Sequence, residues 1–377
     1  MLFFYSQVVW QEVWQRPQEI ALGMADYLPV IFMSPLQVHR LYDSVPSWRR
    51  DFRVERGRGV RVVQPLLLPG EYKSPWIFAL NHELIWAEAC AVLPPENDIV
   101  LLSNSPFSAD LLGRLDWAQR VYDLIDDFPA FGWAPRSGRQ MEERWLEAAD
   151  VVLSGTHALQ ERHGPRRPDI RFIPSGVRFE RFRASSDPMP EELRLLPRPI
   201  LGYIGTVSDR LDRPLLEQLC REFSEGSVVM IGPVHGSFDA PRGVGNLHLL
   251  GPRPHEALPA YVRHFDLALL PFAMTEATRA INPVKTLEYL AAGRIVISTP
   301  VPDVVRFFSN EVVIARDRDE FIRSARYWLT ADSHSLRQRG IERARESSWE
   351  KTVEQFADAT GLGKGMRNAE CGRTVCV

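Results

Sequence analysis

The sequence predicts an α/β protein with two doubly wound parallel-sheet domains that face each other across a cleft. Its 377 residues are too many for one ordinary hydrophobic core, and two domains of about 150–200 residues are expected for this length. Short apolar runs alternate with amphipathic stretches along the chain, which is typical of strands and helices built around parallel sheets. Residues 184–199 (ASSDPMPEELRLLPRP) interrupt this alternation and are typical of a linker between domains.

The first half contains apolar runs that we predict to be strands. They are Leu2–Tyr5, Val30–Met33, Val60–Val63, Ile99–Ser103, Val121–Ile125, Val151–Ser154 and Ile170–Ile173. Helices are expected between several of them, for example at Pro17–Asp26 and Pro106–Leu115, because a proline in the first turn of a helix loses no hydrogen bond.

A second series of predicted strands follows the linker. They are Ile200–Ile204, Val228–Ile231, Leu247–Leu250, Leu267–Leu270, Ile295–Ser298 and Val312–Ile314. The helices expected here include Leu215–Phe223, Pro283–Ala292 and Glu320–Leu329. The Gly-rich end of the chain, 361–377, is expected to be a disordered tail.

The composition excludes several classes of protein. Hydrophobic residues make up 45% and charged residues 25%, which excludes a disordered chain, and the net charge of -3 gives no general attraction to nucleic acid. No apolar run reaches the roughly 20 residues that span a bilayer, and the N-terminus lacks the basic start of a signal peptide. Four scattered cysteines favour a reducing compartment. We therefore expect a cytoplasmic protein.

The stretch Arg40–Arg61 is rich in arginine and has two interpretations. It forms a solvated loop between strands, or it contacts an anionic surface such as the inner face of a membrane, because basic side chains are attracted to acidic lipids. The second interpretation makes the protein peripheral at that membrane.

The segment 280–299 (AINPVKTLEYLAAGRIVIST) carries the most chemical information. Asn282 is predicted to cap a helix that begins at Pro283, which places Lys285 in its first turn. A cation there opposes the helix dipole, so either Lys285 is merely exposed or an anion such as a diphosphate binds beside it. Glu288 lies on the same helical face and suits the paired hydroxyls of a ribose.

Further candidates for nucleotide-sugar binding follow the strands of the second half. Gly205 and Thr206 come directly after the first of these strands, where a glycine lets the backbone approach a phosphate. Gly232 ends a later strand and, like Gly205, also fits a tight turn without a ligand. Arg253 is a candidate contact to the base or phosphate.

The adjacent carboxylates Asp126 and Asp127 end a strand of the first half. They could deprotonate an acceptor hydroxyl or bind sugar diols, or they could form a turn cap. Only one of them is expected to reach the cleft, because neighbouring side chains of an extended chain point to opposite sides. His157 follows another strand, where it either meets the acceptor or starts a helix.

Trp10, Trp14 and Arg16 lie between the first strand and the first helix. An acceptor sugar could stack on the two indoles, or they could pack in the core. We assign all three residues to the acceptor site as a hypothesis.

The stretch NPVKTLEYLAAGRIVIST resembles the donor-nucleotide motif of GT-B glycosyltransferases in family 4 (group 1). The similarity is to the bacterial cell-surface polysaccharide branch with teichuronic-acid-type enzymes. Other segments agree with it in order along roughly residues 1–356: WQRPQEIA, VYDLIDDFPAF, FIPSGVRFERF, IGTVSDRLD and LHLLGPRPHEALPAYVRHFDLALLPF. The sequence departs from the family at Ala280, eight residues before Glu288, where many members have a glutamate.

The resemblance implies transfer of a sugar from a nucleotide-diphosphate sugar, of the UDP type, to a saccharide or lipid-linked acceptor. It implies two Rossmann-like domains and no metal or other cofactor. It further implies retention of configuration, with the donor phosphate taking the acceptor proton, whereas Asp126 or Asp127 acting as a base would allow inversion. Lys285 and Arg210 would stabilise the leaving diphosphate.

The resemblance and the linker together divide the chain. We expect an acceptor domain at 1–183, a linker at 184–199, a donor domain at 200–345, a helix at 346–360 that crosses back to the first domain, and the tail at 361–377.

Three alternatives accompany this interpretation. A nucleotide-sugar 2-epimerase shares the architecture but needs more acid and base groups. A non-catalytic subunit that binds sugar nucleotides is compatible with Ala280. The triplet Asp317-Arg318-Asp319 suggests a metal-dependent GT-A site, but we interpret it as acidic capping at the start of a helix.

Overall fold

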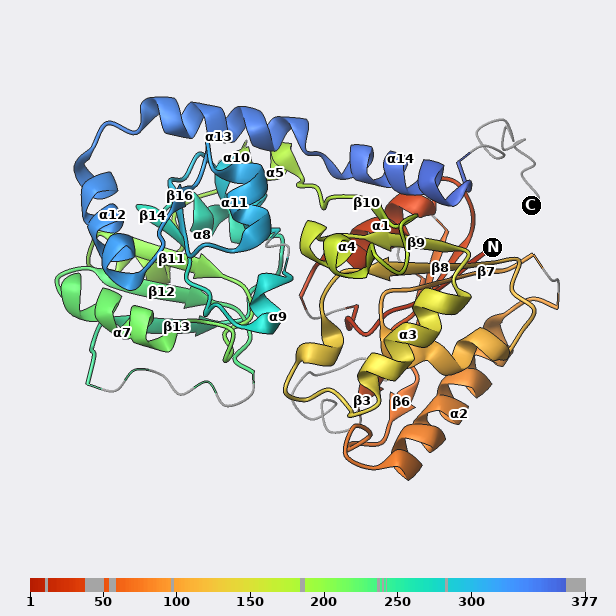
Figure 1. The fold of residues 1–377 in the computed structure, drawn as a ribbon. Coiled ribbons are helices and arrows are strands. Elements are labelled where there is room, and N and C mark those ends of the chain that lie inside the picture. Colours follow the sequence, from red (N-terminus) through yellow and green to blue (C-terminus); the bar gives the residue numbers. More distant parts are fainter. Residues whose placement is uncertain are drawn as a thin grey trace, which may run out of the picture. The chain divides into compact units, whose positions relative to one another are not determined.

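The computed structural model describes residues 1–10, 13–37, 51–53, 59–95, 98–183, 187–235, 238, 241, 243–281 and 284–363 (Figure 1). The chain forms two compact units. Unit 1 comprises Met1–Gly155, Leu159–Pro174 and Glu350–Val377, and unit 2 comprises Thr156–Ala158 and Ser175–Trp349. Unit 1 therefore ends its main run at Pro174, ahead of the expected boundary at residue 183.

Unit 1 is built on an eight-stranded sheet with the order β10-β9-β8-β7-β1-β2-β5-β4. Its strands are β1 (Leu2–Tyr5), β2 (Val30–Met33), β4 (Asp51–Arg53), β5 (Val60–Val63), β7 (Val100–Ser103), β8 (Gln119–Leu124), β9 (Val151–Ser154) and β10 (Arg171–Phe172). All neighbours are parallel except β4, which pairs antiparallel with β5 at the edge. The strands β3 (Leu36–Gln37) and β6 (Leu66–Leu67) form a separate parallel pair.

Helices connect the strands of unit 1 or pack beside them. They are α1 (Arg16–Met24), α2 (Pro75–Val92), α3 (Gly138–Ala148), α4 (His157–His163) and α14 (Trp349–Thr360), with 3-10 helices at Pro106–Gly113 and Phe128–Ala130. The expected helix at Pro106 is thus a 3-10 helix. Helix α14 packs into the core of unit 1 through Phe356, which is fully buried, and through Val353. A Cβ atom at Gly23 of α1 would lie 2.3 Å from Val353, so only glycine permits this helix contact.

Unit 2 is built on a six-stranded parallel sheet with the order β13-β12-β11-β14-β15-β16. Its strands are β11 (Ile200–Ile204), β12 (Ser227–Ile231), β13 (Leu247–Gly251), β14 (Leu267–Leu270), β15 (Val296–Ser298) and β16 (Val313–Ile314). Chain order runs outward from β11 in both directions, which defines a doubly wound sheet with its switch point between β11 and β14. Ligands bind such sheets at the carboxyl ends of the strands next to the switch point.

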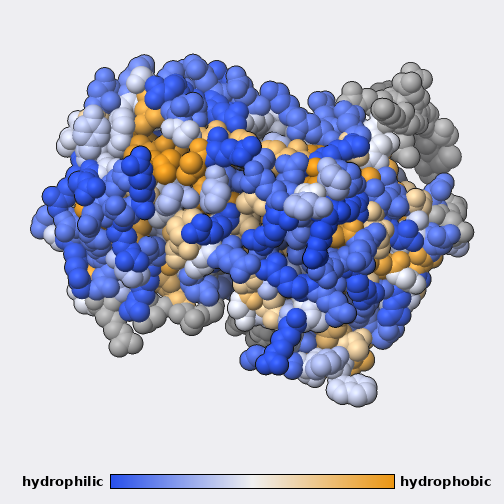
Figure 2. Space-filling view, viewed as in Figure 1, coloured by the Kyte–Doolittle hydropathy of each residue, from blue (hydrophilic) through white to orange (hydrophobic). Residues whose placement is uncertain are grey.

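Nine helices accompany the described strands of unit 2. They are α5 (Phe179–Arg183), α6 (Glu191–Arg194), α7 (Arg213–Glu222), α8 (Leu258–Val262), α9 (Glu276–Arg279), α10 (Lys285–Ala291), α11 (Pro302–Phe308), α12 (Arg318–Thr330) and α13 (His334–Glu346). Figure 2 shows hydrophilic side chains over α13 in unit 2 and over α14 in unit 1. Each unit has its own apolar core.

The predicted fold class is confirmed, because both units contain a doubly wound, Rossmann-like sheet. Asn282 and Pro283, most of the arginine-rich stretch Arg40–Arg61, and the tail after residue 363 lie outside the described residues. Within the described part of the chain, no helix is both long enough and apolar enough to cross a membrane.

Candidate active site

Two glycines shape the carboxyl edge of the sheet in unit 2. Gly205 and Gly232 have φ angles of +140° and +148°, and a Cβ atom on Gly232 would lie 2.0 Å from the carbonyl oxygen of Gly205. The Gly205 N–H donates to the oxygen of Ile231 at 2.8 Å, and the Gly232 N–H donates to the oxygen of Gly251 at 3.0 Å. Both amides therefore continue the pairing of the strands, and the glycines are required for backbone packing. The predicted approach of a phosphate to Gly205 and Gly232 stays a prediction, and it does not involve these two amide hydrogens.

The first turn of α10 combines a cation with a buried carboxylate. Lys285 is the first residue of this helix, and no described residue forms an ion pair with it within 4.0 Å. Glu288, one turn later, is only 6% exposed, and its Oε1 lies 3.1 Å from Nε2 of His255. Burial alone would raise the pKa of Glu288, but the hydrogen bond from His255 and the charge of Lys285 lower it below 4.5. Glu288 is therefore ionised at neutral pH.

His255 is a functional candidate that the sequence analysis did not single out. It lies after β13, and its ring packs edge-on against Phe182 of α5, with 6.0 Å between centroids. The neighbouring residue Glu256 pairs with Arg181 of the same helix at 3.4 Å. These contacts hold His255 against Glu288. Among the described residues, none donates a hydrogen bond to the second carboxylate oxygen of Glu288, so that oxygen retains its capacity to accept one.

Arg210 and Thr206 lie in the loop after β11. The Arg210 carbonyl accepts the N–H of Ala273 at 2.8 Å, which ties this loop to the one after β14. The Thr206 carbonyl accepts the hydroxyl of Tyr203 at 3.1 Å. Burial raises the pKa of Tyr203 to about 12, and the Arg210 charge opposes this shift. Arg210 is thus close to the switch point of the sheet.

Arg253 has a structural partner within unit 2. Its Nη2 donates to Glu192 at 2.8 Å and its Nε donates to the Tyr261 hydroxyl at 3.0 Å. The structure therefore places the Arg253 charge in an ion pair with α6. His255, two residues later, is the side chain of this segment that reaches Glu288.

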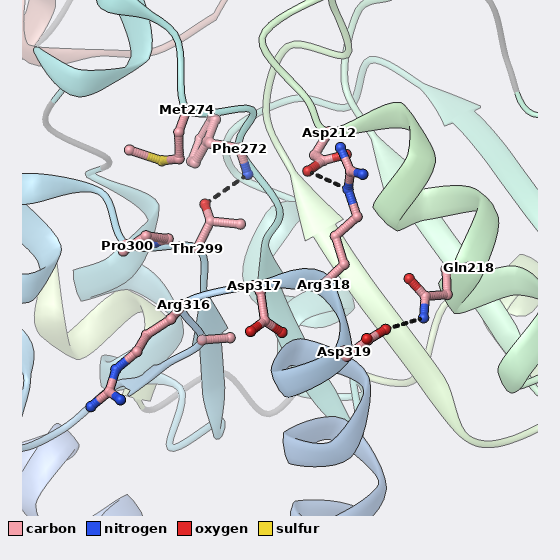
Figure 3. Close-up of a pocket in the computed structure, with 11 residues that line it drawn as sticks. Asp212, Gln218, Phe272, Met274, Thr299, Pro300, Arg316, Asp317, Arg318 and Asp319 are labelled. Atoms are coloured by element: carbon pink, nitrogen blue, oxygen red, sulfur yellow. Dashed lines mark hydrogen bonds and ion pairs between the residues drawn. The ribbon is translucent and has the colours of Figure 1, made fainter.

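A pocket of about 550 Å³ lies at the ends of β14, β15 and β16 (Figure 3). It has charged, polar and apolar walls, lined by Asp212, Gln218, Phe272, Met274, Thr299, Pro300, Ala315, Arg316, Asp317, Arg318 and Asp319. The pocket adjoins the loops after β11 and β14, and the acidic triplet 317–319 forms part of its lining.

The acidic triplet is engaged in contacts that position α12. The Asp317 carboxylate caps the helix by accepting a backbone N–H, and Asp319 accepts the side-chain amide of Gln218 at 3.0 Å. Arg318 donates to Asp212, the cap residue of α7, at 3.0 Å, and Figure 3 shows this pair. No group of three or more potential metal ligands occurs among the residues described.

In unit 1, Arg16 is a core residue. Its guanidinium donates to both carboxylate oxygens of Asp123, at 2.9 and 3.0 Å, and to the carbonyl of Ile173 at 2.9 Å. The two side chains are only 4% and 1% exposed. The structure thus corrects the assignment of Arg16 to the acceptor site, because its donors are used inside the fold.

The two neighbouring aspartates differ in their surroundings. Asp127 is fully buried, and its two oxygens pair with Arg139, at 2.9 Å, and with Arg162. Asp126 is half-buried. The structure gives Asp127 a structural role, which corrects its assignment as an acceptor contact, and leaves Asp126 as the candidate of the pair.

The two tryptophans before α1 also differ. Trp10 is 6% exposed and packs edge-on against Phe32 and Trp14, with centroid distances of 4.8 and 5.6 Å. The Trp14 indole is half-buried and donates to Glu19 at 2.7 Å. Trp10 therefore belongs to the core rather than to a sugar-stacking surface.

His157 opens α4 and is grouped with unit 2. Its backbone N–H donates to Asp303 at 2.9 Å, and its ring lies edge-on to Phe307, with 6.0 Å between centroids. These contacts are those of a residue that starts a helix. The predicted contact of His157 with an acceptor stays a prediction.

Comparison with known proteins indicates the activity. Residues 210–358 match a family described as glycosyl transferase-like. The chain is 24% identical over 277 residues to the Bacillus subtilis (strain 168) teichuronic acid biosynthesis glycosyltransferase TuaH, covering 66% of this chain and 68% of the relative. The resemblance found in the sequence is confirmed. The chain is a glycosyltransferase with the GT-B fold.

Solved structures agree with this fold across nearly the whole chain. Sucrose-phosphate synthase from Thermosynechococcus elongatus has a TM-score of 0.71 at 17% identity, covering 95% of this chain and 97% of that one. An E. coli structure titled trehalose-6-phosphate bound with UDP-2-fluoro glucose has a TM-score of 0.69 at 12% identity, covering 96% and 99%. HepE of Anabaena in complex with UDP has a TM-score of 0.63 at 12% identity, with the same coverage.

Proposed function

We propose that this glycosyltransferase transfers a sugar from a UDP-type nucleotide sugar to a saccharide or lipid-linked acceptor, without a metal and with retention of configuration. The observation that carries the proposal is the pair Lys285 and Glu288 on α10. A cation without an ion-pair partner among the described residues lies one turn from a buried, ionised carboxylate.

The two side chains suit different parts of a nucleotide diphosphate. The Lys285 ammonium stabilises negative charge on the diphosphate as it leaves the sugar, and such electrostatic stabilisation is usually the largest contribution to catalysis. Glu288 accepts hydrogen bonds from ribose hydroxyls through the oxygen that His255 does not use. Arg210 supplies a second cation from the loop after β11. Two similar structures contain UDP or a UDP-sugar, which supports uridine as the base.

The proposed chemistry needs no protein base. The bond between the sugar carbon and the phosphate oxygen breaks, the acceptor oxygen bonds to that carbon from the same face, and the acceptor proton passes to the departing phosphate. The ion pairs of Asp127 with Arg139 and Arg162 agree with this route, because they occupy one of the two neighbouring carboxylates that could act as a base, and Asp126 is the other. The membrane contact through Arg40–Arg61 stays a prediction.

A thermal-shift panel of UDP, GDP, dTDP, ADP and CMP tests the donor site. A nucleotide at 100 times its dissociation constant stabilises the folded protein by about 2.7 kcal/mol. We expect UDP to raise Tm most. Lys285→Ala should weaken the binding of UDP by roughly tenfold or more, because a hydrogen bond to a charged group is lost.

Lys351→Ala is the matched control, because Lys351 is exposed on α14 of unit 1. It should respond to UDP as the wild type does. If no diphosphate raises Tm, or if both lysine variants respond like the wild type, the proposed donor site is wrong. Release of UDP from UDP-glucose then separates an enzyme from a subunit that only binds the nucleotide sugar.

A further inference from the structure

Unit 2 carries four arginines near the amino ends of its strands, the edge of the sheet opposite the candidate donor site. Arg198 precedes β11, Arg263 follows α8, Arg294 precedes β15 and Arg337 lies on α13. We call these four residues the arginine cluster. The four residues of β14, about 13 Å of extended chain, separate the two edges of the sheet. A ligand of the arginine cluster is therefore distinct from a nucleotide held by Lys285.

The arginine cluster gathers around the short segment between α8 and β14. Arg198 Nη2 donates to the carbonyl of His264 at 3.2 Å, and Arg294 Nη1 donates to the carbonyl of the next residue, Phe265, at 3.1 Å. Arg263 immediately precedes this segment as the cap residue of α8. Three of the four arginines thus meet at one short stretch of backbone.

Arg337 reaches the same place because α13 packs against α10. A Cβ atom on Gly293, just after α10, would lie only 3.4 Å from Ile341 of α13. Arg337 precedes Ile341 by four residues, and residues four apart lie on the same face of a helix. Helix α13 therefore brings Arg337 to the side of Gly293, whose neighbour in the chain is Arg294.

The arginine cluster has more positive charge than its neighbours neutralise. The carboxylate of Asp266 pairs with Arg198 at 2.7 Å. Among the residues that the structure describes, no carboxylate lies within 4.0 Å of the guanidinium of Arg263, Arg294 or Arg337. Burial lowers the pKa of Arg294 to about 10, and the charges of the other three arginines add to this shift, whereas Asp266 opposes it. An anion between these side chains would relieve their repulsion.

Two guanidinium groups of the arginine cluster retain donors for such an anion. Arg294 bonds the carbonyls of Ala292 and Phe265 through Nε and Nη1, and cations are favoured at the helix ends where these carbonyls lie. Arg337 donates from Nε to the Ser333 hydroxyl at 2.7 Å. In the described part of the chain nothing accepts a hydrogen bond from Nη2 of Arg294 or from either terminal nitrogen of Arg337.

We propose that the arginine cluster binds a phosphate group, carried as a phosphate monoester or a diphosphate. The planar fork of a guanidinium group matches the oxygens of phosphate and binds them in pairs. A phosphate monoester carries a charge of about -1.5 to -2 at pH 7, which suits several unpaired arginines better than a single carboxylate does. This site goes beyond the proposed transfer reaction, because it lies away from the donor edge. Free phosphorylated compounds and lipid headgroups share this chemistry.

Isothermal titration with inorganic pyrophosphate tests the site. Every protein in the test carries Lys285→Ala, because the proposed donor site also suits a diphosphate. We expect this background to bind pyrophosphate. Adding Arg263→Gln or Arg337→Gln should weaken the binding by roughly tenfold or more, because hydrogen bonds between charged groups are lost.

Arg323→Gln is the matched control, since Arg323 is exposed on α12 and has no ion pair with a described residue. It should bind pyrophosphate like the background. Arg263→Gln also guards against a folding defect, because the Arg263 side chain makes no hydrogen bond to any residue described. Its Tm without phosphate should equal that of the background or exceed it, since a like charge is removed.

Sedimentation with phosphatidylcholine vesicles, with and without phosphatidylglycerol, distinguishes the two sources of phosphate. Binding to the anionic vesicles that is lost in Arg263→Gln indicates a lipid headgroup. Vesicle binding that is absent or independent of Arg263 indicates a free phosphorylated compound. The inference is overturned if the background binds no pyrophosphate, or if Arg263→Gln and Arg337→Gln bind it as tightly as Arg323→Gln does.

Discussion

The two units share a doubly wound sheet but use buried charge differently. In unit 1, Asp127 has two arginine partners and the Arg16–Asp123 pair is almost fully buried, so these charges satisfy one another. In unit 2, Glu288 has His255 on one oxygen. The comparison shows that a charged side chain at a strand end indicates a site only when its bonding capacity is not used up inside the fold.

The largest effect is expected from breaking the buried pair of unit 1. Arg16→Ala leaves Asp123 charged and buried without its partner, which should lower the free energy of unfolding by about 3–5 kcal/mol. Denaturant unfolding followed by circular dichroism measures this. The double variant Arg16→Met/Asp123→Leu should recover most of the stability.

Arg16→Ala also separates structure from acceptor binding. Where the variant remains folded, its affinities for UDP and for a saccharide acceptor should equal those of the wild type. Unchanged stability together with a loss of saccharide binding would return Arg16 to the acceptor site and contradict the comparison.

A second effect concerns Glu142 of α3, a buried carboxylate whose pKa moves in the opposite direction to that of Glu288. Burial and the neighbouring Asp127 raise the pKa of Glu142 to about 7, although Arg139 and Arg162 oppose the shift. A raised carboxyl pKa means that the folded state holds the proton more tightly. Stability therefore falls as pH rises from the ordinary value of 4.5 through 7, by about 3 kcal/mol at most.

Glu142→Gln removes this loss because its side chain stays neutral. We expect the variant to be more stable than the wild type by about 1–3 kcal/mol at pH 8 and nearly equal to it at pH 5. Urea unfolding at the two pH values provides the measurement. A stability difference that does not change with pH would show that Glu142 is ionised in the folded protein.

Local patterns predicted most strands because parallel strands are short, continuous apolar runs. β1, β2, β5, β9, β11 and β14 have the expected bounds. The helix at Pro106 is a 3-10 helix, and α10 begins at Lys285, two residues after the expected Pro283. Proline marks the region of a helix start but does not set the hydrogen-bond pattern that follows.

The candidate sites were harder to predict, because partners distant in sequence decide the role of a charge. Arg16 meets Asp123 across 107 residues, and Arg253 meets Glu192 across 61. His255 was missed for the same reason, since Glu288 lies 33 residues away. A strand-end histidine in the segment that resembles the base-binding region was the available signal.

Glu288 gives the most direct test of the central claim that unit 2 holds a ribonucleotide. Isothermal titration compares UDP with 2′-deoxy-UDP and 3′-deoxy-UDP, using the wild type, Glu288→Gln and, as a buried-carboxylate control, Glu142→Gln. We expect the wild type and the control to bind UDP roughly tenfold more tightly than at least one deoxy analogue. Glu288→Gln should bind all three nearly equally. Equal binding of all three by the wild type, or full discrimination by Glu288→Gln, would contradict the claim.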